Sequence, residues 1–357
     1  MSIIKIAPLR KKIDGVDEKI IALLVERGKL AAEIGRIKKS RDAEYYVPSR
    51  EKEVLMKLRD RNVKPFTRES LENIFREILN ATRSVEKKLS VSYFGPEATF
   101  THQAALKSFG VNAVYIAADT ISGVFEEVEK SRADYGVVPV ENTSEGMVNH
   151  TLDMFFDSDL KIAAEINLPI EHCLLSKSSS IGSIKVVYSH HQALAQTRNW
   201  LSRHLGGARV VETLSTAHAA KIAAGKSSAA AVAGSAAAKM YGLNILAKGI
   251  EDSRTNYTRF LIIGRGMSSP SGSDKTSVMI SIKDRVGALN DILLAFKRHG
   301  INLTKIESRP SKKKAWDYVF FIDFLGHIND SKVKKALTAV DRSARSVKIL
   351  GSYPRAE

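Results

Sequence analysis

The stretch RTNYTRFLIIG, residues 254–264, joins a polar segment to a strongly apolar one. Residues 260–263, FLII, form a short continuous apolar run of the kind that fills a buried strand. Asn256, Thr258 and Arg259 stand directly before this run. Because a buried strand holds its ends in fixed directions, we expect it to aim these polar side chains at a site beside its first residues.

Residues 91–268 repeat this pattern of apolar runs separated by helical stretches. The expected strands are VSYFG, AVYIA, YGVVPV, KVVYS, RVVET, AAVAG, NILAK and RFLIIG, and the expected helices include THQAALKSF, TISGVFEEVEK, HQALAQTRNWL and TAHAAKIAA. Such alternation predicts an α/β domain built on a mostly parallel sheet. The Ser, Gly and Pro residues of MSSPSGSDK, residues 267–275, predict a linker at its end.

Residues 269–357 show a different order of elements. Strand KTSVMISI precedes helix VGALNDILLAFKRHG, strands INLTKIESRP and WDYVFFIDF, helix VKKALTAV and strand SVKILG. The order β-α-β-β-α-β predicts a small α+β domain of the ferredoxin-like kind.

Residues 1–90 have the periodicity of helices. Apolar residues recur every three or four positions from Leu9 to Ile37, which predicts one helix of about eight turns. Two shorter helices are expected over residues 48–60 and 68–89. The long helix would overhang them, so we expect an all-α domain whose apolar overhang is covered in an intertwined dimer.

The bulk composition is that of a globular protein. Hydrophobic residues make up 44% of the chain and charged residues 26%, and no apolar run approaches the roughly 20 residues of a membrane helix. The first residues show no signal or transit pattern, so we expect a cytoplasmic protein. The single cysteine, Cys173, excludes an internal disulfide, and nine histidines without HExxH spacing favour no metal site. We expect no cofactor.

The net charge of +16 resides in the outer segments. Residues 1–90 carry 22 basic and 14 acidic residues, and residues 269–357 carry 17 and 9. Nucleic-acid-binding proteins usually concentrate basic and aromatic residues on one surface. The basic residues here are scattered and aromatic residues total 7%, so nucleic-acid binding is the weaker interpretation.

Charged side chains interrupt the apolar faces of the helical segment. Arg27 and Lys38 lie on the seam of the first helix, and Arg50 and Glu51 begin the second. A single charge at such a position usually reaches water along its apolar stem. Several cations from separate helices would instead form a cavity suited to a small dianion.

With the run TRSVE at residues 82–86, these residues resemble the helical class of chorismate mutase over roughly residues 5–89. The resemblance implies rearrangement of chorismate to prephenate by conformational restriction and by stabilising charge on the ether oxygen. Arginines would hold the substrate carboxylates, one of them supplied in trans, and Lys38 and Glu86 would act at the ether oxygen. The implied chorismate-binding residues are Arg10 (in trans), Arg27, Lys38, Arg50, Glu51, Thr82 and Glu86.

Two positions depart from that family. Val47 stands where some members have Asp, which removes one contact to a substrate hydroxyl. Glu86 replaces a Gln, and a carboxyl group donates to an ether only when it is protonated. We therefore expect mutase turnover to fall as pH rises and Glu86→Gln to flatten that dependence.

Six motifs of the α/β segment, in this order and at this spacing, are similar to those of prephenate dehydratase. They are FGPEATFTHQAA (94–105), YGVVPVENTSEG (135–146), LPIEHCLL (168–175), VYSHHQALAQ (187–196), LSTAHAA (214–220) and NYTRF (256–260). The resemblance implies a two-lobed domain like the periplasmic binding proteins, with the active site between its lobes. Prephenate would there lose its ring hydroxyl and one carboxylate to become phenylpyruvate.

The resemblance makes Thr258 the catalytic residue, as hydrogen-bond donor to the leaving hydroxyl. The implied prephenate-binding residues are Asn142, Thr143, Ser144, Ser189, Gln196, Ser215, Thr216 and Arg259. Arg259 would hold either a substrate carboxylate or the mouth of the strand. Taken singly, hydroxyl and amide residues at helix starts are equally well explained as N-caps. Ala98 replaces the usual Gly, which restricts access to positive φ, and His191 replaces the usual Pro.

GALNDILLAF and INLTKIESRP resemble the ACT domain that follows prephenate dehydratase. The resemblance implies a phenylalanine site at the interface of an ACT dimer and feedback inhibition through a less active conformation. Its residues would be Gly287, Ala288, Leu289, Glu307, Ser308, Arg309 and Pro310. Arg309 is open to a second interpretation, in which it pairs with a neighbouring acid.

Together these resemblances predict a bifunctional chorismate mutase/prephenate dehydratase with a regulatory ACT domain, divided at residues 1–90, 91–268 and 269–357. Chorismate, prephenate and phenylalanine are its expected small-molecule partners, in a homodimer or homotetramer without nucleic acid or membrane. One alternative is a dehydratase whose helical segment serves only dimerisation or regulation. Another is a non-enzymatic amino-acid sensor that binds nucleic acid.

Overall fold

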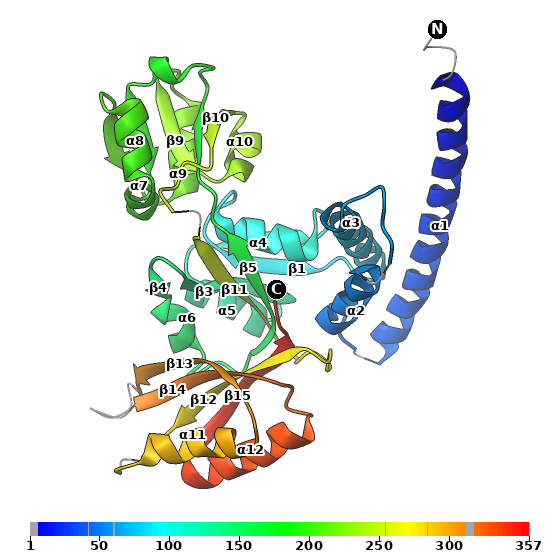
Figure 1. The fold of residues 1–357 in the computed structure, drawn as a ribbon, viewed down its shortest axis with the longest axis vertical. Coiled ribbons are helices and arrows are strands. Elements are labelled where there is room, and N and C mark those ends of the chain that lie inside the picture. The colour runs from blue at the N-terminus through cyan, green and yellow to red at the C-terminus, as the bar shows by residue number, and fades with distance from the viewer. Residues whose placement is uncertain are drawn as a thin grey trace. The chain divides into compact units, whose positions relative to one another are not determined.

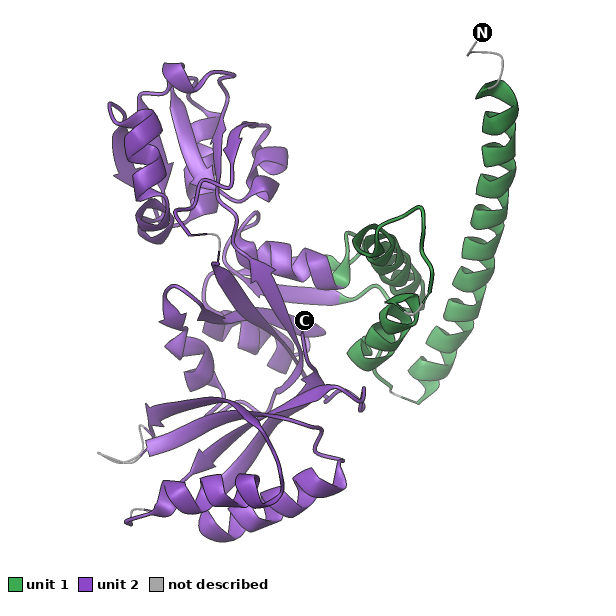
Figure 2. Cartoon of the chain, in the orientation of Figure 1, with its two compact units in different colours: residues 1–89, 109–114 green, residues 90–108, 115–357 purple. Residues whose placement is uncertain are grey.

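The computed structural model describes residues 6–41, 43–59, 61–253, 255–283, 285–311 and 318–356. The chain forms two compact units (Figure 2), one of residues 1–89 with 109–114 and one of residues 90–108 with 115–357. Within the described residues, every helix is too short or too polar to cross a membrane.

The first unit contains the three helices expected from the sequence. They are α1 (Ile6–Ser40), α2 (Pro48–Arg59) and α3 (Arg68–Glu86), and Thr67 caps α3 by accepting a bond from the backbone N–H of Ser70. The third helix ends three residues before the expected end. Gly35 brings α1 against α3, because a Cβ at Gly35 would lie 2.9 Å from the backbone of Glu86.

The first half of α1 extends beyond α2 and α3 (Figure 1), and its apolar residues are exposed among the described residues. Leu9, Ile13 and Ile20 are 58%, 58% and 48% exposed. Only Ala31 and Gly35 of α1 are buried. The overhang expected from the helix lengths is therefore present.

The second unit begins with a sheet of strand order β2-β1-β3-β11-β5, with β4 paired to β3. Its strands are β1 (Ser90–Phe94), β2 (Val114–Ala118), β3 (Tyr135–Asn142), β4 (Gly146–Met147), β5 (Lys161–Pro169) and β11 (Tyr257–Gly264). Its helices are α4 (Phe100–Phe109), α5 (Ile121–Glu129) and α6 (Asn149–Met154). The expected buried strand is β11, and residues 260–264 of it are buried.

A second lobe is built on the order β10-β6-β9-β7-β8. Its strands are β6 (Cys173–Ser176), β7 (Val186–Ser189), β8 (Arg209–Glu212), β9 (Ala229–Ala233) and β10 (Asn244–Lys248). Its helical elements are η2 (Ile181–Ser183), α7 (His191–Gln196), α8 (Arg198–Leu205), α9 (Thr216–Ala224) and α10 (Ser235–Tyr241). Cys173 is fully buried in this lobe.

The expectation of mostly parallel sheets was wrong. β1–β3, β7–β8 and β7–β9 are parallel, but β11 runs antiparallel to both β3 and β5, and β6 runs antiparallel to β9 and β10. The chain crosses between lobes twice, after β5 and before β11, which reverses the strand direction. β5 and β6 are not among the strands expected from the sequence, and the reversal of strand direction depends on both.

The C-terminal segment has the expected β-α-β-β-α-β order. Its antiparallel sheet has the strand order β13-β14-β12-β15, formed by β12 (Asp274–Ser281), β13 (Leu303–Pro310), β14 (Tyr318–Leu325) and β15 (Ser346–Pro354). The helices α11 (Ala288–Arg298) and α12 (Ser331–Ser343) cover one face with a shared apolar core (Figure 1).

The other face of this sheet packs on the first lobe. Phe321, Leu350 and Tyr353 belong to the same apolar cluster as Phe155 and Ile162. Gly351 lets the backbones of β15 and β5 meet, because a Cβ there would overlap the carbonyl oxygen of Ile162. β5 is thus held by β11 on one edge and contacts β15 of the C-terminal sheet.

Candidate active sites

A cavity of about 980 Å³ lies between the two lobes of the second unit. The first lobe contributes Asn142 and Thr258, and the second contributes Gln196, Ser215 and Thr216. Five of the residues predicted for prephenate therefore line one cavity, although they come from four separate motifs. Helix starts and strand ends meet there, as expected of an α/β fold.

Asn142 fixes the direction of the hydrogen bond at Thr258. Asn142 Oδ1 accepts from the backbone N–H groups of Ser144 (2.9 Å) and Glu145 (3.0 Å). Its Nδ2 must therefore be the amide donor, and it lies 2.8 Å from Thr258 Oγ1. Thr258 Oγ1 accepts this bond, so its own hydroxyl proton is available for a group in the cavity. The side chain is nearly buried, with 8% exposed.

The same amide chain continues across the lobes. Asn142 Nδ2 also donates to Asn256 Oδ1 (2.8 Å), and Asn256 Nδ2 donates to Gln196 Oε1 (3.0 Å). Gln196 Oε1 lies 2.9 Å from His172 Nε2, so that ring nitrogen carries the proton. Burial lowers the pKa of His172, which favours the neutral ring. The chain joins β3, β11 and the loop after β5 to α7.

Three other predicted residues lie outside the residues that line the cavity. Ser189 is fully buried and its hydroxyl donates to the carbonyl oxygen of Val232 at 2.6 Å. Thr143 Oγ1 donates to the carbonyl oxygen of Thr255 at 3.0 Å, and Ser144 is exposed. The side chains of Ser189 and Thr143 therefore hold a strand and a loop in this structure.

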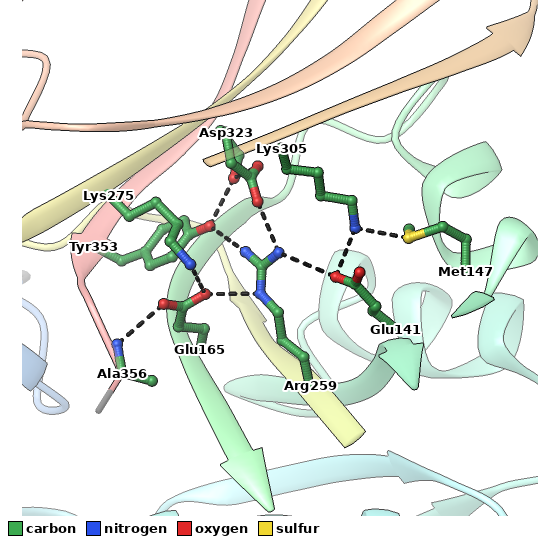
Figure 3. Close-up of polar contacts among 10 residues, drawn as sticks. Glu141, Met147, Glu165, Arg259, Lys275, Lys305, Asp323, Tyr353 and Ala356 are labelled. Atoms are coloured by element: carbon green, nitrogen blue, oxygen red, sulfur yellow. Dashed lines mark hydrogen bonds and ion pairs between the residues drawn. The ribbon is translucent and has the colours of Figure 1, made fainter. Parts of the chain in front are cut away.

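Arg259 also lies outside the cavity lining. Its side chain is 13% exposed and bonds to Glu165 at 2.7 Å, to Asp323 at 2.7 Å and to the hydroxyl of Tyr353 at 3.0 Å. Asp323 and Tyr353 belong to the C-terminal sheet. Figure 3 shows the guanidinium among these partners.

The cavity lining also includes polar residues to which the motifs assigned no role, among them Glu145, His172, Lys221 and Tyr241. Glu145 and His172 belong to two of the dehydratase motifs. The spacing of residues in those motifs does not distinguish a residue that lines the cavity from one that lies in a loop. Glu145 lies 3.3 Å from Gln196 Nε2 and so extends the amide chain. Ser215 caps α9 by accepting from the backbone N–H of His218 at 3.0 Å, so capping and cavity lining coincide there.

Ala98 adopts the conformation that its side chain disfavours. Its φ is +66°, and its N–H donates to His102 Nδ1 at 3.1 Å. At the other departure, the rings of His190 and His191 lie 4.1 Å apart. Burial and the neighbouring His191 lower the pKa of His190, which lines the cavity.

In the first unit, α1 and α3 bring predicted mutase residues together. Lys38 Nζ donates to Glu86 Oε2 at 2.6 Å, and Arg27 donates to the hydroxyl of Thr82. Burial lowers the pKa of Arg27, Glu86 opposes this shift, and the charge of Arg50 adds to it. Lys38 thus pairs with Glu86, and Arg27 with Thr82, along the contact between α1 and α3. The charge of Arg50 acts on Arg27.

The remaining mutase residues lie at the start of α2 and on α1. Glu51 Oε1 pairs with Arg83 at 2.9 Å, and burial raises the pKa of Glu51 although Arg83 opposes the shift. Arg50 is 61% exposed and pairs with Glu53 at 2.6 Å. Arg10 lies on the exposed first half of α1, among the apolar residues of the overhang.

In the C-terminal segment, Gly287 precedes α11 with a φ of +80°. A positive φ favours Gly, and a Cβ there would meet nothing within 4 Å, so conformation and not crowding requires it. Arg309 Nη2 pairs with Asp153 of α6 at 2.9 Å, the second of the two interpretations left open for it. GAL, residues 287–289, begins α11, and ESRP, residues 307–310, ends β13.

Three family models match the chain in the predicted order. Chorismate mutase type II matches residues 9–87, prephenate dehydratase residues 91–268 and the ACT domain residues 276–342. The bifunctional chorismate mutase/prephenate dehydratase of Aquifex aeolicus is 54% identical over 352 residues, which cover 98% of this chain and 97% of that protein. The chain belongs to the bifunctional chorismate mutase/prephenate dehydratase family.

Other members of this family match over the same span. The bifunctional chorismate mutase/prephenate dehydratase of Pseudomonas aeruginosa is 43% identical over 98% of this chain and 97% of that protein. These matches include the helical segment, which favours the bifunctional prediction over a dehydratase with a merely structural N-terminus. The chain is thus an enzyme with a mutase and a dehydratase domain and an ACT domain.

Solved dehydratases share the fold of the second unit. The prephenate dehydratase of Arthrobacter aurescens, in complex with L-Phe, is 34% identical with a TM-score of 0.69, covering 75% of this chain and 90% of that chain. The prephenate dehydratase of Staphylococcus aureus is 29% identical with a TM-score of 0.66, covering 74% and 100%. The two-lobed α/β and ACT folds are confirmed.

Proposed function

We propose that prephenate binds in the cavity between the lobes and that Thr258 is the group that assists loss of its ring hydroxyl. The supporting observation is the direction of one hydrogen bond: Asn142 donates to Thr258 Oγ1 at 2.8 Å, which leaves the threonine proton for the substrate. The lining of the cavity by Asn142 from one lobe and Gln196, Ser215 and Thr216 from the other supports this placement of the substrate.

The reaction balances with a single donor. The bond between the ring carbon and its hydroxyl breaks, and its electron pair leaves with the oxygen, which becomes water by taking up a proton that solvent supplies in the net reaction. The bond between the ring and the carboxylate breaks as well; CO2 leaves, and the electron pair of that bond stays with the ring and makes it aromatic. A hydroxyl donor fixed at the leaving oxygen stabilises the charge that develops there.

The experiment that tests this assignment uses Thr258→Ala and Thr258→Ser in the full chain. We expect Thr258→Ala to lower dehydratase kcat by roughly 100-fold or more, the size of a lost acid–base contact, and Thr258→Ser to retain most of it. Mutase turnover of the same samples is the internal control for folding. Undiminished phenylpyruvate formation by Thr258→Ala would contradict the proposal.

For the mutase, the proposed groups at the ether oxygen are Lys38 and Glu86, which form an ion pair in the free site. Arg27 and Arg50 would hold the carboxylates, with Arg10 supplied by a second subunit, and Glu51 and Thr82 would complete the site. The exposed apolar stripe of α1 beside Arg10 supports a homodimer or a larger homo-oligomer. We place the enzyme in the cytoplasm.

Glu86→Gln tests the mutase assignment. The amide of the variant donates at every pH, whereas the carboxyl group of the parent donates only when protonated. We expect parental mutase turnover to fall with rising pH and the variant to remain nearly flat. Superimposable pH profiles would exclude Glu86 from the ether oxygen.

Phenylalanine is the proposed feedback inhibitor, bound at Gly287, Ala288, Leu289, Glu307, Ser308, Arg309 and Pro310. The Arthrobacter dehydratase, which shares the fold of this unit, was solved with L-Phe. Added phenylalanine should lower dehydratase turnover and raise the thermal midpoint. No change in either quantity would contradict the assignment.

A further inference from the structure

Arg259 directly follows Thr258 on β11, but its guanidinium is enclosed by protein. Nε donates to Glu165 Oε2 at 2.7 Å, Nη1 donates to Asp323 Oδ2 at 2.7 Å, and Nη2 donates to Tyr353 Oη at 3.0 Å. Each of the three nitrogens therefore has a partner of the chain (Figure 3). None of these three partners lines the cavity.

Asp323 and Tyr353 are supplied by the ACT domain, and a further ACT residue holds them in place. Ser277 Oγ lies 2.5 Å from Asp323 Oδ1 and 2.6 Å from Tyr353 Oη. Lys275 Nζ donates to Glu165 Oε2 at 2.8 Å, from the same strand β12. Two ACT strands, β14 and β15, thus bond to one arginine of the dehydratase domain, and β12 holds the partners of that arginine.

The charges of this cluster balance. Lys305 Nζ pairs with Glu141 Oε2 at 2.9 Å, and Arg259 Nη1 lies 3.9 Å from the same oxygen. Three cations therefore face three carboxylates: Arg259, Lys275 and Lys305 against Glu141, Glu165 and Asp323. Buried charges are stable only with such partners. Arg259 needs no substrate carboxylate to neutralise it.

The pairing of β11 with β3 is irregular at this residue. Arg259 lies opposite Glu141, but Phe260 lies opposite Pro139, so β3 holds one extra residue between them. The extra residue lies on β3, and a bulge bends the strand that carries it. On its other edge, β11 pairs with β5 without a shift from Tyr257 to Ile262. An anchor at Arg259 would therefore fix β11 beside Thr258, on the edge where its ladder to β3 is interrupted.

We propose that Arg259 is a positioning residue, and that the ACT domain, through Asp323 and Tyr353, holds β11 so that Thr258 is aimed at its substrate. The inference rests on the proposed role of Thr258. Arg259 acts through the strand and does not touch prephenate. The ACT domain is then part of the dehydratase machinery even without its regulator.

Asp323→Asn in the full-length enzyme tests this role, because it removes one charge and preserves the shape of the side chain. We expect dehydratase kcat to fall by about 10-fold or more, within the roughly 100-fold that a misplacement of about 1 Å costs. The KM for prephenate should change by no more than about twofold, because no substrate contact is lost. Mutase turnover should equal that of the parent.

Lys348→Met is the matched control. Lys348 Nζ also links the ACT domain to the dehydratase domain, by donating to the carbonyl oxygens of Phe155 at 3.0 Å and Ser158 at 2.8 Å, but it lies outside the Arg259 cluster. The Lys348→Met variant should keep the kcat of the dehydratase near the parental value. An equal loss in Lys348→Met and Asp323→Asn would show that domain attachment in general, and not the Arg259 link, sets the rate.

Tyr353→Phe gives a second reading if Asp323→Asn fails to fold. It removes a single hydroxyl and should lower kcat in the same direction by a smaller factor. Parental kcat in Tyr353→Phe and in a folded Asp323→Asn would overturn the inference, as would Arg259→Lys raising KM alone.

Thr258→Ala separates this inference from the proposed function. If Thr258→Ala stays active, the proposed role of Thr258 fails. If Thr258→Ala is inactive and Asp323→Asn keeps the parental kcat, only the role of Arg259 fails.

Discussion

On the cavity side of β11, Thr258 bonds to the amide of Asn142, which continues through the amides of Asn256 and Gln196, whereas next to it Arg259 lies in a cluster of six charges. In the first arrangement, the fixed amide of Asn142 leaves one proton of Thr258 for a ligand. In the second, the cations and carboxylates satisfy one another. A polar side chain is available to a substrate when its protein neighbours leave one of its hydrogen-bond donors or acceptors unpaired. When the neighbours pair all of these groups, the side chain stabilises the fold instead.

Asn142→Asp should lower dehydratase turnover more than the other substitutions below, because it reverses the hydrogen bond at Thr258. The new carboxylate still accepts from the backbone N–H groups of Ser144 and Glu145, but it accepts from Thr258 too and draws the hydroxyl proton away from the substrate. We expect dehydratase kcat to fall by about 100-fold, equivalent to the roughly 1–3 kcal/mol of a misdirected buried hydrogen bond.

A recovery of kcat at acidic pH would be the signature of this mechanism, because a protonated carboxyl group becomes a donor to Thr258 again. Steady-state kinetics between neutral and mildly acidic pH measure it, with mutase turnover as the control. Parental kcat at neutral pH would mean that the direction of the bond between Asn142 and Thr258 is irrelevant.

Gly351→Ala tests the contact between the ACT sheet and β5. Its Cβ would overlap the carbonyl oxygen of Ile162, a backbone atom that cannot rotate away. We expect a loss of about 1–3 kcal/mol in unfolding free energy, as for an overpacked core, and a lower thermal midpoint. Gly207→Ala, where a Cβ meets nothing within 4 Å, is the control. Equal midpoints for the two variants would argue against a tight contact between β15 and β5.

The charged cluster should show itself in the acid stability of the protein. Burial alone would raise the pKa of Asp323, but Arg259 and Ser277 outweigh it and the pKa is lowered. A lowered pKa in the folded state stabilises the protein above the ordinary Asp value of about 3.9, and this stability is lost as pH falls through the lower folded value.

The difference in urea midpoint between the parent and Asp323→Asn should therefore be constant near neutral pH and shrink in acid. Far-UV circular dichroism of urea titrations across this range measures it. A difference that persists unchanged at the lowest pH would show that the charge of Asp323 contributes nothing.

Ala98→Gly should have the smallest effect, although Ala98 has a φ of +66° beside the cavity. Relief of about 1–2 kcal/mol of left-handed strain is offset by the greater freedom of Gly in the unfolded chain, about 0.4–1 kcal/mol, and by loss of a buried methyl group, about 0.8 kcal/mol. We expect a change below about 1 kcal/mol by urea unfolding and unchanged kcat. Ala98→Val, which keeps the strain and adds β-branching, should be clearly destabilising.

Much of the fold followed from local patterns. The long helix, the two short helices and the β-α-β-β-α-β order each arise from spacings of two to four residues, and the structure contains all of them. The direction of the central strands did not follow, because β5 carries Glu165 and Asn167 within its apolar run and was not recognised. Without β5, the antiparallel place of β11 had no visible partner.

The candidate sites divide in the same way. The motifs supplied Asn142, Gln196 and Thr258, and the structure places all three around one cavity. They also supplied Ser189 and Arg259, whose side chains bond to a backbone carbonyl and to a charged cluster instead. A motif marks the neighbourhood of a site, but the side of a strand on which a side chain lies depends on register and on bulges.

The sequence by itself determined three domains, their order and the residue at which dehydration is proposed, because periodicity and motifs are properties of near neighbours. Only the tertiary structure decided what Arg259 contacts. Its partners Glu165, Asp323 and Tyr353 lie 94, 64 and 94 residues away in the chain. No local spacing encodes such pairs, since they form only when the ACT sheet packs on β5 and buried charges must find partners.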